Sequence, residues 1–311
     1  MAIPADLRLE ALTAPLDRTA AETRWRTYLE AHPESAHRDD NRNYGVLIFL
    51  IALVGLLAVV LLAVVVEDLR SSSLATPVVS AIGPFCGAVF MLLLVWLFAR
   101  SLVRTRTRRM TAEVHSRLSR LATDNELDYR SGPLHPDDLA PWSGWRGLSV
   151  DRVLSTRSGR RLEVGNYNLL LGSGGMQVGS GGNTRYRGGY VAVGLDRAAP
   201  TVVLDERGTR RPFLAGRAPR KQRMDTGTAL DKHFRVYSPP ETQDVVRRLL
   251  TGVAGELSNV RHMSVEVRDG WILCSSRREL VTLDADTWSW VGTIMRATSR
   301  LADALEADPR P

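Results

Sequence analysis

Two long apolar stretches dominate the hydrophobic pattern of the chain, residues 44–66 and 78–99, and neither contains a charged side chain. At a rise of about 1.5 Å per residue, a helix over either stretch would cross the roughly 30 Å hydrocarbon core of a bilayer. Eleven residues, 67–77, separate the two stretches, which is enough for a tight turn. The pattern therefore predicts a transmembrane hairpin of two helices.

Basic residues flank this hairpin on its outer sides, whereas the turn carries Arg70 alone, beside Glu67 and Asp68. Positively charged flanks of membrane helices stay on the cytoplasmic side. We therefore expect a multi-pass protein of the cell (plasma) membrane with both termini cytoplasmic. Cys86 lies in the second stretch and Cys274 far from it, so no disulfide framework is expected, which suits a reducing compartment.

Beyond residue 148 the pattern changes to short apolar or alternating runs separated by Gly, Pro and Asp, which is typical of strands and turns. Apolar residues at helical spacing predict one helix after Ser238 and Pro239, through a capping box, and a second helix from about Asp286. These elements predict a cytosolic α+β domain with an antiparallel sheet and two helices, and a partly rolled sheet fits the same pattern. Strands are expected at 148–156, 160–171, 190–195, 201–204, 233–237, 263–267 and 271–274.

Shorter segments connect these two parts. A weak apolar stripe between residues 19 and 31 fits a helix docked on the membrane or on the domain, and equally a frayed tail. A stripe through Val114, Leu118 and Leu121 is better explained by packing on the domain than by self-association, because sustained heptads are absent. Trp142 and Trp145 are expected to anchor the linker on the domain surface. The predicted divisions are a cytosolic N-terminal segment 1–43, the hairpin 44–99, a juxtamembrane helix 100–129, a linker 130–147 and the α+β domain 148–306.

Three stretches of the predicted domain carry a family resemblance. Residues 159–167, GRRLEVGNY, are similar to the GR-x-V-x-VGNY strand of an uncharacterised family of actinobacterial two-span membrane proteins. Residues 230–239, LDKHFRVYSP, resemble that family's L-E-G-x-F-x-x-x-F-x-V-Y-x-P segment, although the register departs from it around Asp231 and Lys232. Residues 265–272 resemble its E-I-x-D-G-x-L hairpin. The family has no assigned activity, so the resemblance implies a source and an architecture, and no functional residue is carried over.

Positive charge is concentrated in one segment of the predicted domain. The chain holds 41 basic and 34 acidic residues, a net charge of +7, and residues 207–223 alone carry seven basic residues and no acidic one. Near an anionic leaflet each such charge is worth about 1 kcal/mol. The residues expected to contact anionic lipid headgroups or an acidic partner are Arg207, Arg210, Arg211, Arg217, Arg220, Lys221 and Arg223, together with Arg104, Arg106, Arg108 and Arg109.

Motifs for catalysis, cofactors and metals are incomplete in this sequence. The glycine-rich run 172–182 lacks the Lys-Ser/Thr that ends a phosphate-binding loop, and it fails the dinucleotide spacing. The run Asp284-Ala-Asp286-Thr hints at an acidic metal or phosphotransfer motif but lacks the Thr one place later that the phosphatase signature needs, and Asp286 at a helix start is explained as a cap. None of the six histidines has a metal-ligand spacing. We assign no catalytic, cofactor-binding or metal-binding residue. An enzyme is disfavoured without being excluded, because catalytic residues can converge from distant positions.

The sequence as a whole predicts a membrane-anchored cytosolic interaction or regulatory module. Its expected partners are the lipid bilayer, anionic lipid headgroups and an unidentified protein. Gly55, Gly83 and Gly87 in the apolar stretches would also suit a homo-oligomer. Two alternatives remain, an enzyme at the inner leaflet and a membrane-tethered nucleic-acid-binding protein. Nucleic acid is the less favoured partner because Phe213 is the only aromatic residue in the basic segment.

Overall fold

The computed structural model describes residues 7–33, 111–134, 142, 148–171, 184–207 and 222–307, together with Gly55, Val60, Ala63, Gly87, Val89, Leu93 and Trp96. The chain divides into two units, Met1–Ser35 with Ala112–Pro311, and Ala36–Thr111. Of the second unit, the structure describes little more than those seven single positions. The fold described below is therefore the fold of the first unit.

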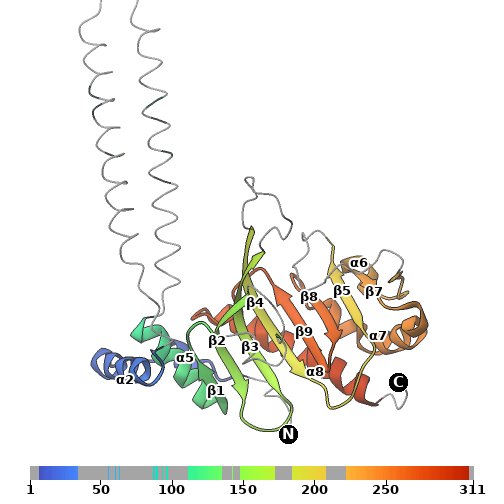
Figure 1. Cartoon of the computed structure of the whole chain (residues 1–311), viewed down its shortest axis with the longest axis horizontal. Helices are drawn as coiled ribbons and strands as arrows, with labels where there is room; N and C mark the ends of the chain where they lie inside the picture. Colours follow the sequence, from blue (N-terminus) through green and yellow to red (C-terminus); the bar gives the residue numbers. More distant parts are fainter. Residues whose placement is uncertain are drawn as a thin grey trace, which may run out of the picture. The chain divides into compact units, whose positions relative to one another are not determined.

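The first unit is built on one antiparallel sheet of nine strands, in the order β1-β2-β3-β4-β9-β8-β5-β7-β6 (Figure 1). Each pair of neighbouring strands runs antiparallel. The strand order places β1 and β6 at the two ends of the sheet. The strands are β1 (Leu127–Arg130), β2 (Leu148–Thr156), β3 (Leu162–Leu171), β4 (Thr184–Gly194), β5 (Val202–Glu206), β6 (Arg223–Met224), β7 (Phe234–Tyr237), β8 (Ser264–Arg268) and β9 (Trp271–Ser276).

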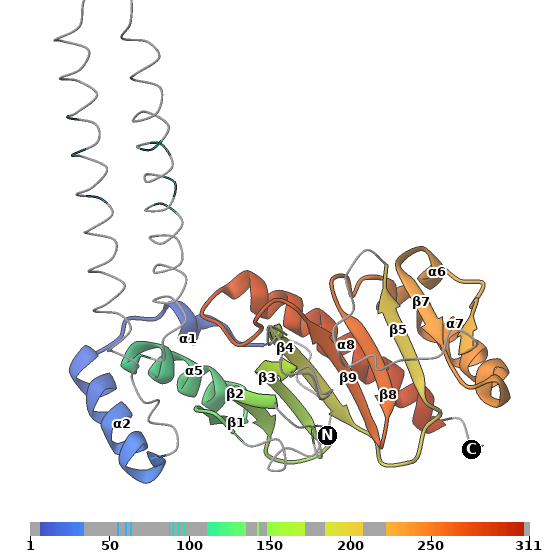
Figure 2. The same ribbon diagram turned by 45° about the horizontal axis from the view of Figure 1, so that its top comes forward.

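Helices lie near both ends of the sheet and cover one of its faces (Figure 2). The helices near β1 are α1 (Glu10–Thr13), α2 (Arg18–Ala31) and α5 (Ala112–Asp124). Those that follow β6 and β7 are α6 (Leu230–His233), the 3₁₀ helix η6 (Pro240–Thr242) and α7 (Gln243–Ser258). The last helix, α8 (Ala285–Ala307), packs beside α7 and crosses the same face of the sheet.

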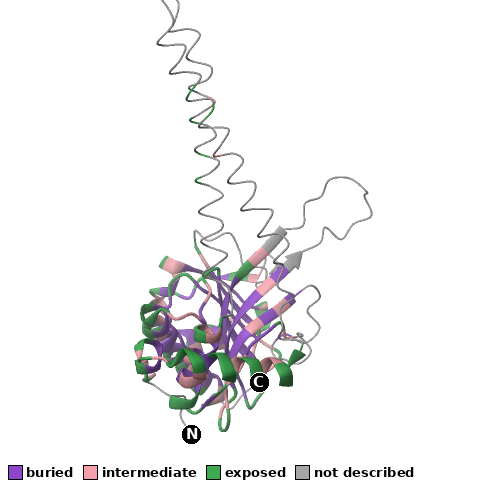
Figure 3. Ribbon diagram, turned by 90° about the vertical axis from the view of Figure 1, so that its left-hand side faces the viewer, coloured by how far each residue is buried: buried purple, intermediate pink, exposed green. Residues whose placement is uncertain are grey.

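The main hydrophobic core lies between the sheet and the helices α7 and α8. In β8, Val265 and Val267 are buried in this core, and the alternation of strand side chains directs Ser264 and Glu266 to the opposite face. Each fully buried Val or Leu side chain stabilises the fold by roughly 1.5–3 kcal/mol. Figure 3 shows the result: the strands are mostly buried, whereas the outward sides of the helices are exposed.

The Gly-Asn-Tyr sequence of β3 has a structural role. A Cβ atom on Gly165 would lie 2.6 Å from Cε1 of Tyr190, so a glycine is required where the tyrosine ring crosses β3. The buried Asn166 side chain accepts hydrogen bonds from the backbone N–H groups of Leu280 and Val281, and its Nδ2 donates to Val281 O. These bonds fix the segment that leads into α8.

A second, smaller core lies on the other face of the sheet, over β2, β3, β4 and β9. Its centre is Trp142, which is completely buried and packs edge-on against Tyr190 with ring centroids 4.8 Å apart. The prediction that Trp142 anchors the linker is confirmed, but this tryptophan lies inside a core instead of on the domain surface, and Trp145 lies outside the described residues.

Most predicted strands are confirmed, with boundaries shifted by one to a few residues, and β4 begins six residues earlier than expected. The short strands β1 and β6 were not predicted. The predicted capping box is wrong, because no side chain caps η6 or α7. At α8 the capping residue is Asp284, which accepts a hydrogen bond from Thr287 N, and Asp286 already belongs to the helix.

Two predictions, one about the N-terminal segment and one about the connecting segment, are confirmed: both segments pack on the domain. The helix expected between residues 19 and 31 is α2, which packs on α5, so the interpretation as a frayed tail is wrong. Leu118 and Leu121 of α5 are buried in the main core, which confirms packing over self-association.

Within the part of the chain that the structure describes, no helix combines the length and the apolar character needed to cross a membrane. The longest one, α8, has 23 residues but is amphipathic, because it buries Trp288 and Leu301 and exposes Arg296 and Arg300. Such a helix suits packing on a sheet, and its charged face would be costly in hydrocarbon. The predicted fold of a transmembrane hairpin plus a cytosolic α+β domain is therefore corrected to a nine-stranded antiparallel sheet with flanking helices.

The same finding overturns the predicted location, a multi-pass protein of the plasma membrane with both termini cytoplasmic. The stretches that motivated it, 44–66 and 78–99, lie outside the described residues except at seven single positions. The proposals for function therefore rest on the first unit alone.

Candidate functional site

The sheet face opposite α7 and α8, called the open face, changes character from one half to the other. Over β2, β3, β4 and most of β9 it carries the apolar core around Trp142, which includes Trp271 and Leu273 of β9. From Ser275 of β9 across β8, β5, β7 and β6 its side chains are mostly polar or charged. The strand register places Ser275 beside Ser264, Glu266 beside Val203, and Asp205 beside Arg235.

Three exposed arginines, Arg207, Arg223 and Arg235, gather at the β6 end of the sheet and are called the arginine edge. Arg235 alternates with the buried Phe234 and Val236, so its side chain lies on the open face. Arg223 pairs with Tyr237, two residues further along the same face. Arg207 directly follows β5, and its Nε donates to the backbone oxygen of Phe234 at 3.2 Å.

Acidic groups next to the arginine edge balance only part of its charge. The buried carboxylate of Asp205 lies 3.9 Å from Nη1 of Arg235, a contact that aligns the arginine without a close hydrogen bond. Glu206 accepts a hydrogen bond from His262 N at 2.7 Å and is therefore already engaged. In the sequence, residues 208–222 join Arg207 to Arg223 and add five basic residues and no acidic one. The charge of the arginine edge itself is therefore positive.

A buried row of polar side chains, Ser264, Glu266 and Ser275, lies between the apolar half of the open face and the arginine edge. The three residues are only 5%, 6% and 1% exposed. The two hydroxyl oxygens and Oε2 of Glu266 have no hydrogen-bond partner among the described residues. Oε1 of Glu266 lies 3.4 Å from Nη1 of Arg268.

The protonation of Glu266 follows from this environment. Burial raises the pKa of Glu266 to about 7, and the nearby Arg268 guanidinium opposes this rise. At neutral pH the carboxyl group is therefore close to half ionised. It can either donate or accept a hydrogen bond, which is unusual for a carboxyl group in a folded protein.

Of the eleven predicted contact residues, the structure describes two, Arg207 and Arg223, and it places both at the arginine edge. The others, Arg104, Arg106, Arg108, Arg109, Arg210, Arg211, Arg217, Arg220 and Lys221, lie outside the described residues. Sequence reasoning missed Arg235. The alternation of Phe234, Arg235 and Val236 could have shown that this arginine faces outward, but its neighbours on β5 and β6 become evident only from the sheet order.

The described residues offer little for catalysis or metal binding. The Cys274 thiol is buried in the main core, and burial raises its pKa, which makes it a poor nucleophile. Asp284 serves as a helix cap. No group of three or more His, Cys, Asp or Glu side chains in the described ranges could hold a metal ion. The glycine-rich run 172–182 lies outside the described residues.

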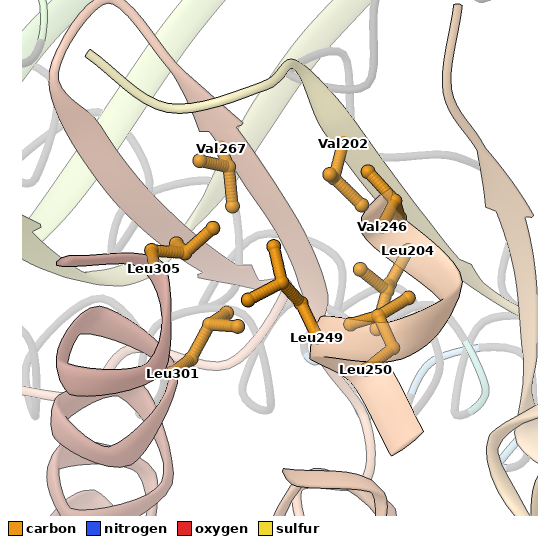
Figure 4. Close-up of a pocket in the computed structure, with 8 residues that line it drawn as sticks. All are labelled: Val202, Leu204, Val246, Leu249, Leu250, Val267, Leu301 and Leu305. Atoms are coloured by element: carbon orange, nitrogen blue, oxygen red, sulfur yellow. The ribbon is translucent and has the colours of Figure 1, made fainter. Parts of the chain in front are cut away.

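An apolar hollow lies between α7, α8 and the sheet (Figure 4). Its cavity volume of about 10 Å³ is far below the roughly 300–1,000 Å³ typical of small-molecule sites, and no polar side chain lines it to orient a ligand. It is best described as a gap in the main core. The lining residues are Val202, Leu204, Val246, Leu249, Leu250, Val267, Leu301 and Leu305.

Comparisons with known proteins yield little. No family model matches the chain, and no curated protein matches it. One solved structure, the crystal structure of the mycobacterial trehalose monomycolate transport factor A, TtfA, aligns with a TM-score of 0.42 and 14% sequence identity. The alignment covers 63% of this chain and 98% of that one. This likeness is too slight to decide the fold or function, and the resemblance to an actinobacterial family stays a prediction.

Proposed function

We propose that this chain is an interaction module that binds an acidic segment of a partner protein through the arginine edge. The observation that carries the proposal is the placement of Arg223 and Arg235 on the neighbouring strands β6 and β7, with Arg207 directly after the adjoining strand β5, all exposed to solvent. They are supported by the rigid sheet, which lowers the entropic cost of presenting them together.

Arginine suits this task because its planar guanidinium can donate two parallel hydrogen bonds to one carboxylate. A single exposed ion pair contributes only about 0.2–1 kcal/mol, so several must act together to give useful affinity. Clusters of arginine are a recurrent means of recognising acidic or phosphorylated segments. The segment between positions 208 and 222 adds five further basic residues in the sequence.

An acidic polypeptide is favoured over nucleic acid. Sequence-tolerant binding of single strands depends on aromatic side chains on which bases stack. The aromatic residue beside the arginine edge, Tyr237, is only 5% exposed and offers no stacking platform.

The test uses the full chain and a fluorescent polyglutamate peptide of about 20 residues, with binding followed by anisotropy. Changing Arg207, Arg223 and Arg235 together to Gln should weaken binding at least about tenfold, equivalent to ~1.4 kcal/mol. A control variant removes the same charge elsewhere, by changing Arg26, Arg248 and Arg300 to Gln. These arginines are exposed on α2, α7 and α8. Added salt should weaken wild-type binding by screening.

Two results would overturn this proposal. One is equal weakening in the two triple variants, which would indicate attraction to net charge alone. The other is tighter binding of duplex DNA, or of vesicles that contain anionic lipid, than of polyglutamate at matched salt. The partner of the arginine edge would then be nucleic acid or lipid instead of an acidic polypeptide.

A further inference from the structure

The helix α2 is held against the domain by an aromatic cluster around His115. This histidine, on α5, is only 5% exposed. Its ring lies 4.8 Å from Trp25 and 4.4 Å from Tyr28 of α2, and 5.4 Å from Tyr129 of β1, measured between ring centroids. Its Nδ1 atom is buried and has no hydrogen-bond partner among the described residues. His115 is therefore the central contact between α2, α5 and β1.

Other contacts of α2 with the domain are few. Ala21 is the one fully buried residue of α2, and Trp25 and Tyr28 are half-buried. The Tyr28 hydroxyl donates to Ser131 O at 2.9 Å and accepts from Ser131 N at 3.0 Å. A helix with so little buried surface belongs to the part of a structure that opens most easily.

The preceding helix α1 is attached independently of His115. Arg117 donates hydrogen bonds to the backbone oxygens of Leu12 and Ala14, and these atoms lie 2.6 and 3.0 Å from its Nη1. Asn125 accepts a hydrogen bond from Arg8 N and donates another to Arg8 O. None of these contacts involves the imidazole ring, so α1 has no reason to follow α2 if the aromatic cluster separates.

We propose that protonation of His115 releases α2 from α5 and β1 while α1 remains docked, which makes this contact an acid-sensitive switch. The inference is independent of the arginine edge and of the proposed partner.

The surroundings of His115 disfavour an added charge. An imidazolium ion would lose its hydration on burial, and His32, the C-cap residue of α2 that stacks on Tyr28, repels it when both are protonated. The rings of Trp25 and Tyr28 would attract the cation and offset part of this cost. The phenol of Tyr129 offers no anion, because burial raises its pKa. The charges of two residues on β2 shift the pKa of Tyr129 in opposite directions: Arg152 lowers it and Asp151 raises it.

The net effect of these groups is that burial, with a smaller contribution from His32, lowers the pKa of His115 to about 4 from 6.5. A histidine whose pKa is lower when α2 is docked stabilises docking above pH 6.5. This stabilisation is lost progressively as the pH falls towards 4. Over that interval the docking equilibrium should weaken by up to about 300-fold, since each pKa unit corresponds to a factor of ten.

The experiment is hydrogen–deuterium exchange of the full chain at pH 7.0 and 4.5, expressed as protection relative to unstructured peptide at each pH. We expect residues 18–31 to lose protection at pH 4.5 and residues 10–14 to retain it. The variant H115F keeps an aromatic ring but cannot be protonated, so its α2 should stay protected at both pH values. The matched variant H32Q should still release α2 at low pH.

Three results would overturn the proposal. The first is unchanged protection of α2 between pH 7.0 and 4.5 in the wild-type chain. The second is loss of protection in H115F equal to that of the wild type, which would assign the effect to another group. The third is simultaneous loss at residues 10–14, which would indicate general acid unfolding instead of release of one helix. Should H115F fail to fold, the His115 ring protons of the wild-type chain are titrated by NMR instead. The pH at which they titrate must then coincide with the pH at which α2 loses protection.

Discussion

The two ends of the nine-stranded sheet, seen in Figure 2, differ in what their polar side chains contact. At the β1 end, polar groups bind backbone atoms far away in sequence: Asn125 bonds to Arg8, 117 residues away, and Tyr28 bonds to Ser131, 103 residues away. At the β6 end, Arg223 and Arg235 are exposed on short strands. The first end uses polar groups to fix the chain, whereas the second presents them to solvent.

The difference teaches how to separate structural from functional polar residues in this fold. A buried side chain that satisfies backbone donors and acceptors is costly to lose, because its partners are then left without hydrogen bonds. An exposed charge contributes little to stability and is available for binding. The polar row of Ser264, Glu266 and Ser275 belongs to neither class, since it is buried without full hydrogen bonding.

The largest effect on stability is expected from N125A. The Asn125 side chain makes three hydrogen bonds, accepting from Arg8 N and donating to Arg8 O and Leu121 O. Their loss should lower the free energy of unfolding by about 3 kcal/mol, measured by urea denaturation. The control T123A removes an exposed hydrogen bond within α5 and should cost less than about 0.5 kcal/mol. Equal costs for the two variants would contradict the structural role of the β1 end.

The next effect is the pH dependence of E266Q. Because burial raises the pKa of Glu266 to about 7 from 4.5, the carboxyl group favours folding below pH 4.5, and this contribution is lost as the pH rises through 7. Gln keeps the shape without ionising. At pH 8 we expect E266Q to be more stable than the wild type by about 1–3 kcal/mol, and at pH 5 the gap should close. A variant that is less stable than the wild type at pH 8 would show that the ionised carboxylate is stabilising.

A smaller effect is expected from Y28F. This change removes the hydroxyl that donates to Ser131 O and accepts from Ser131 N, and it leaves the aromatic contact with His115 in place. The free energy of unfolding should fall by about 1 kcal/mol. Protection of residues 18–31 against hydrogen exchange should fall with it at neutral pH, while residues 10–14 stay unchanged. A loss of protection in both segments would mean that α1 and α2 dock as one unit.

The smallest effect on stability is expected at the arginine edge. Changing Arg207 and Arg223 together to Gln should alter the free energy of unfolding by no more than about 0.5 kcal/mol per residue, because both side chains are exposed. Arg235 is kept in this variant because it lies beside the buried carboxylate of Asp205. The measurement is thermal unfolding, compared with that of a variant in which Arg26 and Arg300 are changed to Gln. A much larger loss in the first variant alone would make these arginines structural.

Sequence patterns predicted the long strands well because apolar alternation in β2, β3 and β8 extends over several residues. They could not predict β6, since a ladder of two residues, Arg223 and Met224, has no period of its own. The contact of Asn125 with Arg8 was equally invisible, because no local pattern reports a bond across 117 residues.

The candidate site was predictable in part. Composition alone pointed to Arg207 and Arg223 as contact residues. It could not show that Arg235 joins them, because their proximity depends on the order β5-β7-β6 in the sheet. The apolar stretches gave the firmest sequence signal and led to the transmembrane hairpin, which the described helices do not support.

The most direct test of the contrast between the two ends is hydrogen exchange at pH 7.0 with and without the polyglutamate peptide. We predict that added peptide slows exchange in β5, β6 and β7, residues 202–207, 222–224 and 234–237. Exchange at residues 7–31 and 112–131 should stay unchanged. Slower exchange at the β1 end, or an equal change at both ends, would contradict the assignment of binding to the arginine edge.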